Sequence, residues 1–102
     1  MAELTGNIEL GGNIELVGFK ELEPAKLIVV KKIVGNYARR MSDSSKGFEK
    51  LTVTMKTVHN SKYELHAKLM DNGNPIVSEV VDFNIFFALD KALAKIMGSL
   101  EK

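Results

Sequence analysis

LTVTMKTV at residues 51–58 and YELHAKL at residues 63–69 alternate apolar and polar side chains. This alternation is typical of strands that bury one face of a sheet and expose the other. The polar residues HNSK at 59–62 turn the chain between them, so we expect an antiparallel pair. The exposed face of that pair then carries Thr52, Thr54, Lys56, Glu64, His66 and Lys68.

A helix is predicted before this pair. Glu23-Pro24 marks its start, since proline suits the first helical turn, and apolar residues then recur with a period near 3.6. The β-branched residues at 28–30 and 33–34 also favour a strand, but a segment of roughly eighteen residues with internal lysines fits a helix better. SDSSKG at 42–47 is a loop by composition. The predicted apolar stripe is Leu27, Val30, Val34, Tyr37/Ala38 and Met41.

A strand and a second helix are predicted after the pair. DNGNP at 71–75 is the strongest turn signal in the chain, and residues 76–81 follow it as a strand. Asp82 or Asn84 can cap the last helix. The buried stripe expected for this helix is Phe86, Leu89, Leu93, Ile96 and Leu100.

The N-terminus contains a short repeat, GNIEL at 6–10 and again at 12–16. The pair Gly11-Gly12 can adopt the positive φ angles of a two-residue hairpin turn, so the two copies can form a hairpin. Alternatively, the second copy is the first strand and residues 1–11 are a loose extension. We therefore expect residues 1–102 to form one α+β domain with the element order β-α-β-β-β-α. This order makes a two-layer sandwich, with a mainly antiparallel four-stranded sheet, two helices on one face and an N-terminal strand as a possible addition.

Composition agrees with one ordinary globular domain. Of the 102 residues, 45% are apolar and 26% are charged, and there is no cysteine for a disulfide or a thiolate metal site. No apolar run is long enough to span a bilayer, and the start of the chain lacks the features of a signal peptide. We therefore expect a cytoplasmic protein without membrane contact.

Charge is unevenly distributed along the chain. Residues 1–19 carry three acids and no base, residues 20–62 carry ten bases and four acids, and residues 63–102 carry four bases and six acids. The net charges are −3, +6 and −2, which give the overall +1. A basic middle segment indicates a face that binds polyanions, although the surface patterning of a soluble domain gives the same distribution.

No catalytic constellation is visible, so we expect neither an enzyme nor a cofactor. The chain has two histidines, His59 in a turn and His66 within a strand, and the nearby carboxylates Glu64 and Asp71 are too few for a convincing zinc site. The histidines are therefore predicted to be ordinary surface residues, with no metal. Gly11-Gly12 lacks the following helix and Lys-Ser/Thr of a phosphate-binding loop.

Structured RNA is the predicted partner. Basic side chains on the first helix, its loop and the exposed sheet face can neutralise phosphates, whereas that sheet face offers no aromatic side chain for stacking bases. This favours recognition of the RNA backbone over a stacking mode, unless the lysines merely solubilise the helix. The predicted nucleic-acid-binding residues are Lys31, Lys32, Arg39, Arg40, Lys46, Lys50, Lys56, His66 and Lys68.

Two other functions stay open at this point. Ile8, Leu10 and the outward-facing Val58, Val77 and Val81 can form an apolar surface for a partner protein or a homodimer. The cluster of Phe83, Phe86 and Phe87 suggests a small apolar ligand between helices and sheet, although phenylalanines at helical spacing are usually plain core.

With this order of elements, residues 13–102 resemble the ribosome hibernation-promoting factor and ribosome-associated inhibitor family. The resemblance rests on NIELVG at 13–18, KKI at 31–33 in the first helix, FFALDKA at 86–92 in the last helix, and Lys95. It implies a domain that binds the decoding region of the small ribosomal subunit, blocks mRNA and tRNA there, and so regulates translation.

Overall fold

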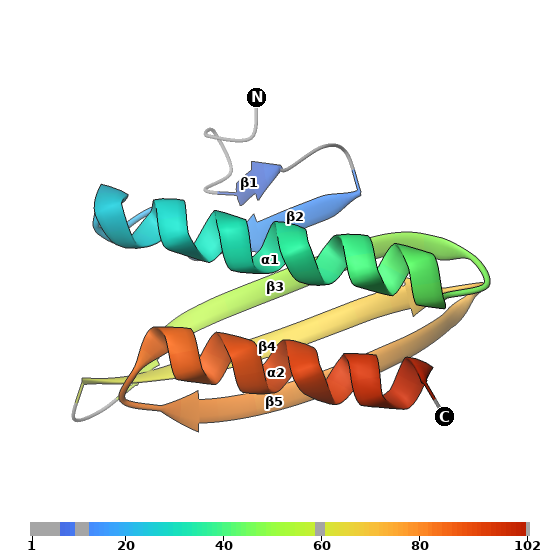
Figure 1. Cartoon of the computed structure of the whole chain (residues 1–102). Helices are drawn as coiled ribbons and strands as arrows, with labels where there is room; N and C mark the ends of the chain where they lie inside the picture. Colours follow the sequence, from blue (N-terminus) through green and yellow to red (C-terminus); the bar gives the residue numbers. More distant parts are fainter. Residues whose placement is uncertain (1–6, 10–12, 59–60, 102) are drawn as a thin grey trace.

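The two alternating segments form the longest strands of a five-stranded sheet in the computed structural model, which describes residues 7–9, 13–58 and 61–101. Two helices cover one face of this sheet and leave its other face open (Figure 1). In chain order the elements are β1 (Asn7–Glu9), β2 (Ile14–Val17), α1 (Pro24–Ser44), β3 (Phe48–Val58), β4 (Lys62–Asp71), β5 (Asn74–Asp82) and α2 (Ile85–Leu100).

The strands are ordered β1-β2-β3-β4-β5 across the sheet. Strands β2 and β3 are parallel and are joined by α1, while the other neighbouring strands are antiparallel. A parallel pair needs such a crossover, whereas an antiparallel pair such as β4 and β5 can be joined by a two-residue turn. The predicted α+β sandwich, with its β-α-β-β-β-α order and both helices on one face, is confirmed.

The repeated N-terminal sequence supplies an additional strand at the edge of the sheet. β1 pairs antiparallel with β2, so that Asn7 lies opposite Val17 and Glu9 lies opposite Glu15. Residues 7–9 of the first GNIEL copy are therefore a strand and not a loose extension. The turn predicted at Gly11-Gly12 lies outside the described residues.

The register between β3 and β4 places the polar residues on one face, as predicted. Thr52 lies opposite Lys68, Thr54 opposite His66, and Lys56 opposite Glu64. The alternate residues point toward the helices and are buried: Leu51, Val53, Met55, Leu65, Ala67 and Leu69. Together with the buried residues of both helices they form the core of the domain.

The turn between β4 and β5 is a two-residue hairpin turn. Asp71 lies opposite Asn74, and the two residues between them, Asn72 and Gly73, have φ angles of +54° and +83°. Asparagine followed by glycine is the preferred sequence for such a turn, because both adopt positive φ with little strain. The turn predicted from DNGNP is confirmed.

Helix α1 begins with Pro24 in its first turn and buries Val30, Val34, Ala38 and Met41. These are members of the stripe predicted from the sequence, and packing of that stripe outweighs the strand preference of the β-branched residues. The helix ends at Ser44, whereas the loop was predicted to begin at residue 42. The backbone N–H of Ser45 donates to the Met41 carbonyl at 2.8 Å, so helical hydrogen bonding continues about one turn beyond the boundary that composition indicated.

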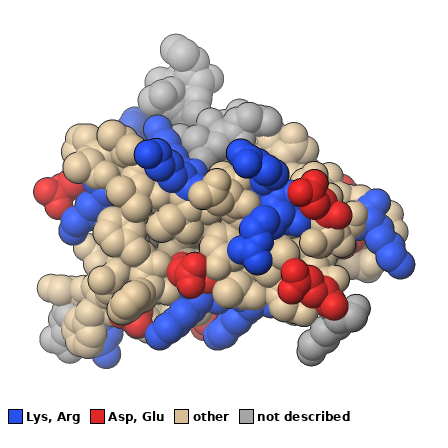
Figure 2. Space-filling model, in the orientation of Figure 1, with Lys and Arg blue, Asp and Glu red and all other residues tan. Residues whose placement is uncertain are grey.

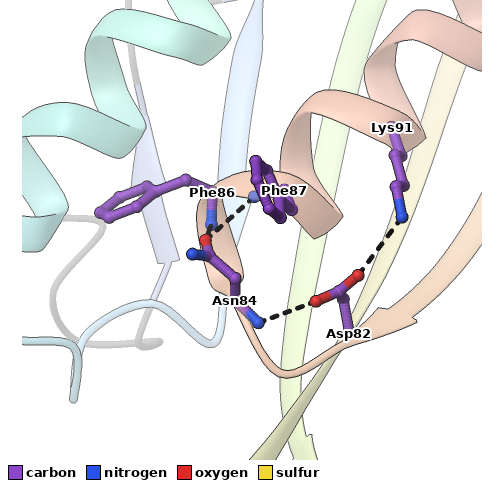
Figure 3. A network of polar contacts seen from close by, with 5 residues as sticks. All are labelled: Asp82, Asn84, Phe86, Phe87 and Lys91. Carbon is purple, nitrogen blue, oxygen red and sulfur yellow. Dashed lines mark hydrogen bonds and ion pairs between the residues drawn. The ribbon is translucent and has the colours of Figure 1, made fainter.

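Helix α2 begins after a polar cap that uses both predicted residues (Figure 3). Asn84 is the N-cap: its Oδ1 accepts hydrogen bonds from the backbone N–H of Phe86 at 2.9 Å and of Phe87 at 3.1 Å. Asp82 accepts from the Asn84 N–H at 2.9 Å and pairs with Lys91 at 3.4 Å. The buried residues of α2 are Ile85, Ala88, Leu89, Ala92, Leu93, Ile96 and Met97, while Phe86 and Leu100 of the predicted stripe are half-buried.

Candidate nucleic-acid interface

Four predicted phosphate-binding residues lie exposed on α1: Lys31, Lys32, Arg39 and Arg40, which together define the basic face of α1. With about 100° of rotation per residue, Lys32 and Arg39 differ by roughly 20° around the helix axis and point away from the buried stripe. They are separated by about 10 Å along the axis. Lys31 and Arg40 fall on opposite flanks of the helix, so Lys32 and Arg39 form the centre of this face.

Arg40 also has a structural contact. Its guanidinium carbon lies 5.2 Å from the centre of the Tyr37 ring, whose hydroxyl donates a 2.7 Å hydrogen bond to Asp90 of α2. Burial raises the pKa of Tyr37 above its ordinary value, and the neighbouring Asp90 carboxylate raises it further. Asp90 is exposed on α2, and this hydrogen bond ties the two helices together.

The two lysines expected in the loop after α1 lie in different places. Lys46 is exposed in that loop. Lys50 belongs to β3, where its Nζ pairs with Glu15 of β2 at 2.9 Å. Lys46 therefore lies exposed just beyond the end of α1, while Lys50 has an acidic neighbour on the sheet.

Lys56, His66 and Lys68 project from the open face of the sheet, on the opposite side from α1. The nine predicted residues thus divide between two surfaces and do not form one continuous patch. Figure 2 views the helix-bearing side, where Lys and Arg side chains gather over the half crossed by α1 and acidic side chains stand between them. The open sheet face is also mixed, because Glu15, Glu64 and Glu79 share it with the lysines.

His66 is surrounded by carboxylates. Its Nε2 contacts Glu64 Oε2 and lies 3.2 Å from Glu79 Oε2. Glu64 and Asp71 were the neighbours predicted for the histidines, and Glu79 was missed. The position of Glu79 can be derived from the turn signal at Asn72-Gly73. His66 lies six residues before Asn72 and Glu79 lies six residues after Gly73, so a two-residue turn places the two residues opposite each other. His59 lies outside the described residues.

The open sheet face carries no aromatic platform within the described strands, since their two aromatic residues, Phe48 and Tyr63, pack against the core. The exposed aromatics lie elsewhere, at the junction of β5 and α2: Phe83 and Phe87 are 62% and 63% exposed, and Lys62 lies 5.1 Å from the centre of the Phe83 ring. An open cleft of about 260 Å³ beside them is lined by Lys26, Tyr63, Phe83, Asn84, Ile85 and Phe86. This volume is below that of typical ligand pockets, so the cleft gives the small-ligand hypothesis little support.

The fold of this chain, an α+β sandwich, is shared with two solved structures, whose names agree with the resemblance read from the sequence. A crystal structure of the Thermus thermophilus Protein Y N-terminal domain matches with a TM-score of 0.61 and 15% identity, over 72% of this chain and 80% of that one. A ribosomal subunit interface protein from Coxiella burnetii matches with a TM-score of 0.60 and 13% identity, over 79% of this chain and 84% of that one. At such identities the likeness is one of fold.

Sequence comparison adds no closer relative, since no protein-family model and no curated protein sequence matches the chain. Neither of the helices in the described residues combines the length and the apolar character that crossing a membrane requires.

Proposed function

We propose that this chain is a non-enzymatic domain that associates with the ribosome by contacting phosphates of structured RNA through the basic face of α1. The observation that carries the proposal is the exposure of Lys31, Lys32, Arg39 and Arg40 on a helix whose other side is fixed in the core. The likeness in fold to a ribosomal subunit interface protein supports the choice of the ribosome among RNA partners.

Binding through this face is electrostatic. Each Lys or Arg that meets a phosphate releases condensed counterions, so affinity falls as salt rises. Arg39 can engage a phosphate with two parallel hydrogen bonds, while Lys32 acts as a point charge about two helical turns away. A rigid helix presents these charges in fixed positions, which suits recognition of the shape of folded RNA better than stacking of single-stranded bases.

The absence of a catalytic role is part of the proposal. In the described residues His66 interacts with Glu64 and Glu79, and no hydrogen bond joins it to a serine or threonine hydroxyl. His66 and its two carboxylates therefore lack the hydroxyl or thiol partner that a histidine base activates as a nucleophile. We propose that the basic face of α1 serves binding and not turnover.

The test is a titration of the protein against small ribosomal subunits and against a structured RNA at several salt concentrations. The double variant Lys32→Ala/Arg39→Ala removes two charges from α1, and Lys56→Ala/Lys68→Ala removes two exposed charges from the open sheet face as a matched control. We expect the α1 variant to lower the slope of log affinity against log salt by about 1.5, since each lost contact removes roughly 0.7–0.9. The sheet variant should leave the slope nearly unchanged.

Two results would count against the proposal. Absence of binding by the unaltered protein at low salt would reject RNA association altogether. A larger effect of the sheet variant than of the α1 variant would move the contact surface to Lys56 and Lys68, the other predicted group.

A protein-interaction role is the second candidate, because apolar side chains are exposed along the β5 edge of the molecule. Val77 and Val81 are 69% and 50% exposed on the open sheet face, next to the exposed Phe83 and Phe87. β5 is also an edge strand, whose unpaired backbone groups can receive another strand. Light scattering tests self-association: a homodimer that is lost on Val77→Lys would support this role, and a strict monomer would argue against a homodimer.

A further inference from the structure

Three potential metal ligands converge on the open face of the sheet, away from the basic face of α1. Glu64 and His66 are two residues apart on β4 and therefore share a face, and Glu79 lies directly opposite His66 on β5. One ligand atom from each residue lies within 4.8 Å of the other two. The grouping follows from strand alternation and register, so the backbone holds it in place.

Both carboxylates approach the same imidazole nitrogen. His66 Nε2 contacts Glu64 Oε2 and lies 3.2 Å from Glu79 Oε2. An Nε2 atom carries one hydrogen at most, so it can donate a good hydrogen bond to one carboxylate but not to both. The second carboxylate is then left beside another negative charge. A dication at this point would balance both carboxylates and accept the nitrogen lone pair, which satisfies all three groups together.

The spacing of the three groups suits zinc. Zinc–nitrogen and zinc–oxygen bonds of about 2.0–2.2 Å in a tetrahedron place neighbouring ligand atoms roughly 3.3 Å apart, close to the 3.2 Å between His66 and Glu79. Small side-chain rotations bring Glu64 to the same separation. One nitrogen and two carboxylate oxygens with a water as fourth ligand is a donor set of the kind that Zn²⁺ accepts.

The position within the sheet provides both support and access. The side chains of Glu64 and His66 are 25% and 38% exposed, so they are held by their neighbours, whereas Glu79 is 63% exposed and leaves an entry path from solvent. β4 is hydrogen-bonded on both sides, by β3 and β5, which fixes the ligands that it carries. Ligands on such rigid elements lose little conformational freedom when an ion binds.

We infer that Glu64, His66 and Glu79 form a surface site for a divalent transition-metal ion, with Zn²⁺ as the fitting ion. The imidazole ligand favours Zn²⁺, Co²⁺ or Ni²⁺ over Mg²⁺ and Ca²⁺, which prefer oxygen ligands alone. Binding would cancel two negative charges beside Lys56 and Lys68. The open sheet face would then become more positive without any change of fold.

The test is calorimetric titration of the full chain with Zn²⁺, together with the visible spectrum of the Co²⁺ form. We expect saturable binding of one ion per chain and a melting temperature that rises with Zn²⁺ concentration. His66→Ala and Glu79→Gln should each weaken binding by at least about tenfold, because each removes a direct ligand. His59→Ala removes the other histidine of the chain and serves as the control that should bind normally.

Circular dichroism of each variant without metal separates loss of a ligand from loss of the fold, and Glu64→Gln gives a third independent variant. The inference is overturned if the unaltered protein shows no saturable Zn²⁺ binding, or if binding survives His66→Ala. It is equally overturned if His59→Ala abolishes binding, or if Mg²⁺ binds as strongly as Zn²⁺. The outcome does not depend on the RNA titration, so the two proposals fail separately.

Discussion

Replacing Gly18 with alanine should destabilise the domain more than the same change at two other glycines. Gly18 follows β2 with a φ of +83°, in the left-handed region that favours glycine. A Cβ at this position would come closer to the Met55 carbonyl oxygen than the 3.0 Å that real contacts respect. Because Met55 lies in β3, inside the sheet, the backbone of that strand cannot move away freely.

The size of the expected destabilisation follows from comparing Gly18 with glycines that differ from it in one respect at a time. Gly73 has the same φ of +83°, but no atom lies within 4 Å of the place where an alanine Cβ would stand, so Gly73→Ala costs only the backbone strain of about 1–2 kcal/mol. Gly18→Ala adds an overpacking cost of about 1–3 kcal/mol, for a total of about 2–5 kcal/mol. Gly35 lies inside α1 with equally free space, so Gly35→Ala should stabilise by about 1 kcal/mol.

The assay is urea unfolding of the three variants and the unaltered protein, monitored by circular dichroism at the same temperature. Midpoints give the free energies of unfolding, provided that the slopes agree among the proteins. The reasoning would be refuted if Gly18→Ala lost no more stability than Gly73→Ala, since the close approach to Met55 would then cost nothing. Destabilisation by Gly35→Ala would refute the account of the helix.

Three further predictions concern the polar contacts of the helices. Asn84→Ala should lower the free energy of unfolding by about 1 kcal/mol, because two backbone N–H groups of α2 lose their acceptor. Tyr37→Phe should cost about 0.5–1.5 kcal/mol at neutral pH by removing the bond to Asp90. The pKa of Tyr37 is raised above 10.0, so the stabilisation that the protonated hydroxyl gives the folded state is present below that pH and is lost as pH rises through the folded pKa. Tyr37→Phe should therefore reduce the fall in the free energy of unfolding at alkaline pH. The backbone N–H of Asn84, with the help of Lys91, lowers the pKa of Asp82 below 3.8. The stabilisation that the ionised Asp82 carboxylate gives the folded state is therefore present above that pH and is lost as pH falls through the folded pKa. Asp82→Asn should weaken this acid dependence of the free energy of unfolding, measured by chemical unfolding.

Each of these predictions has a matched comparison. Asn84→Ser retains a capping oxygen and should keep most of the stability, so an equal loss in the serine and alanine variants would contradict the cap. Asp90→Asn should reproduce part of the Tyr37→Phe effect, and a double variant with additive losses would show that the two groups do not interact. An unchanged acid limb in Asp82→Asn would mean that Asp82 does not contribute to it.

Most of the fold can be predicted from the sequence because its strands and helices carry strong periodic patterns. Alternation in β3 and β4 indicated which residues face the core, and the Asn72-Gly73 turn indicated the hairpin after them. The end of α1 was missed because SDSSKG has the composition of a loop, whereas the helix continues to Ser44 and ends with the Ser45 N–H bonded to the Met41 carbonyl. Composition measures local preference, which is a weak guide to where a helix ends.

The candidate site could be predicted as a set of residues and in part as surfaces. Charge counts identified the basic segment, while strand alternation and the expectation of both helices on one face implied that Lys56 lies on the opposite side of the sheet from α1. The proximity of Glu79 to His66 follows from the register of the β4–β5 hairpin, which depends on the two-residue turn at Asn72-Gly73 and not on the alternation within either strand. Pairwise proximity across strands is not contained in a pattern along one strand.

The single parallel strand pair has a consequence for the order of folding. Asp71 and Asn74 meet across a two-residue turn, whereas Ile14 reaches Leu51 only after α1 has been spanned. Closing the longer loop costs more chain entropy, and this cost precedes the gain from contacts. We therefore expect β3, β4 and β5 to assemble with α2 first and β2 to dock last, so that under native conditions the backbone amides of β2 exchange with solvent before those at the centre of β4.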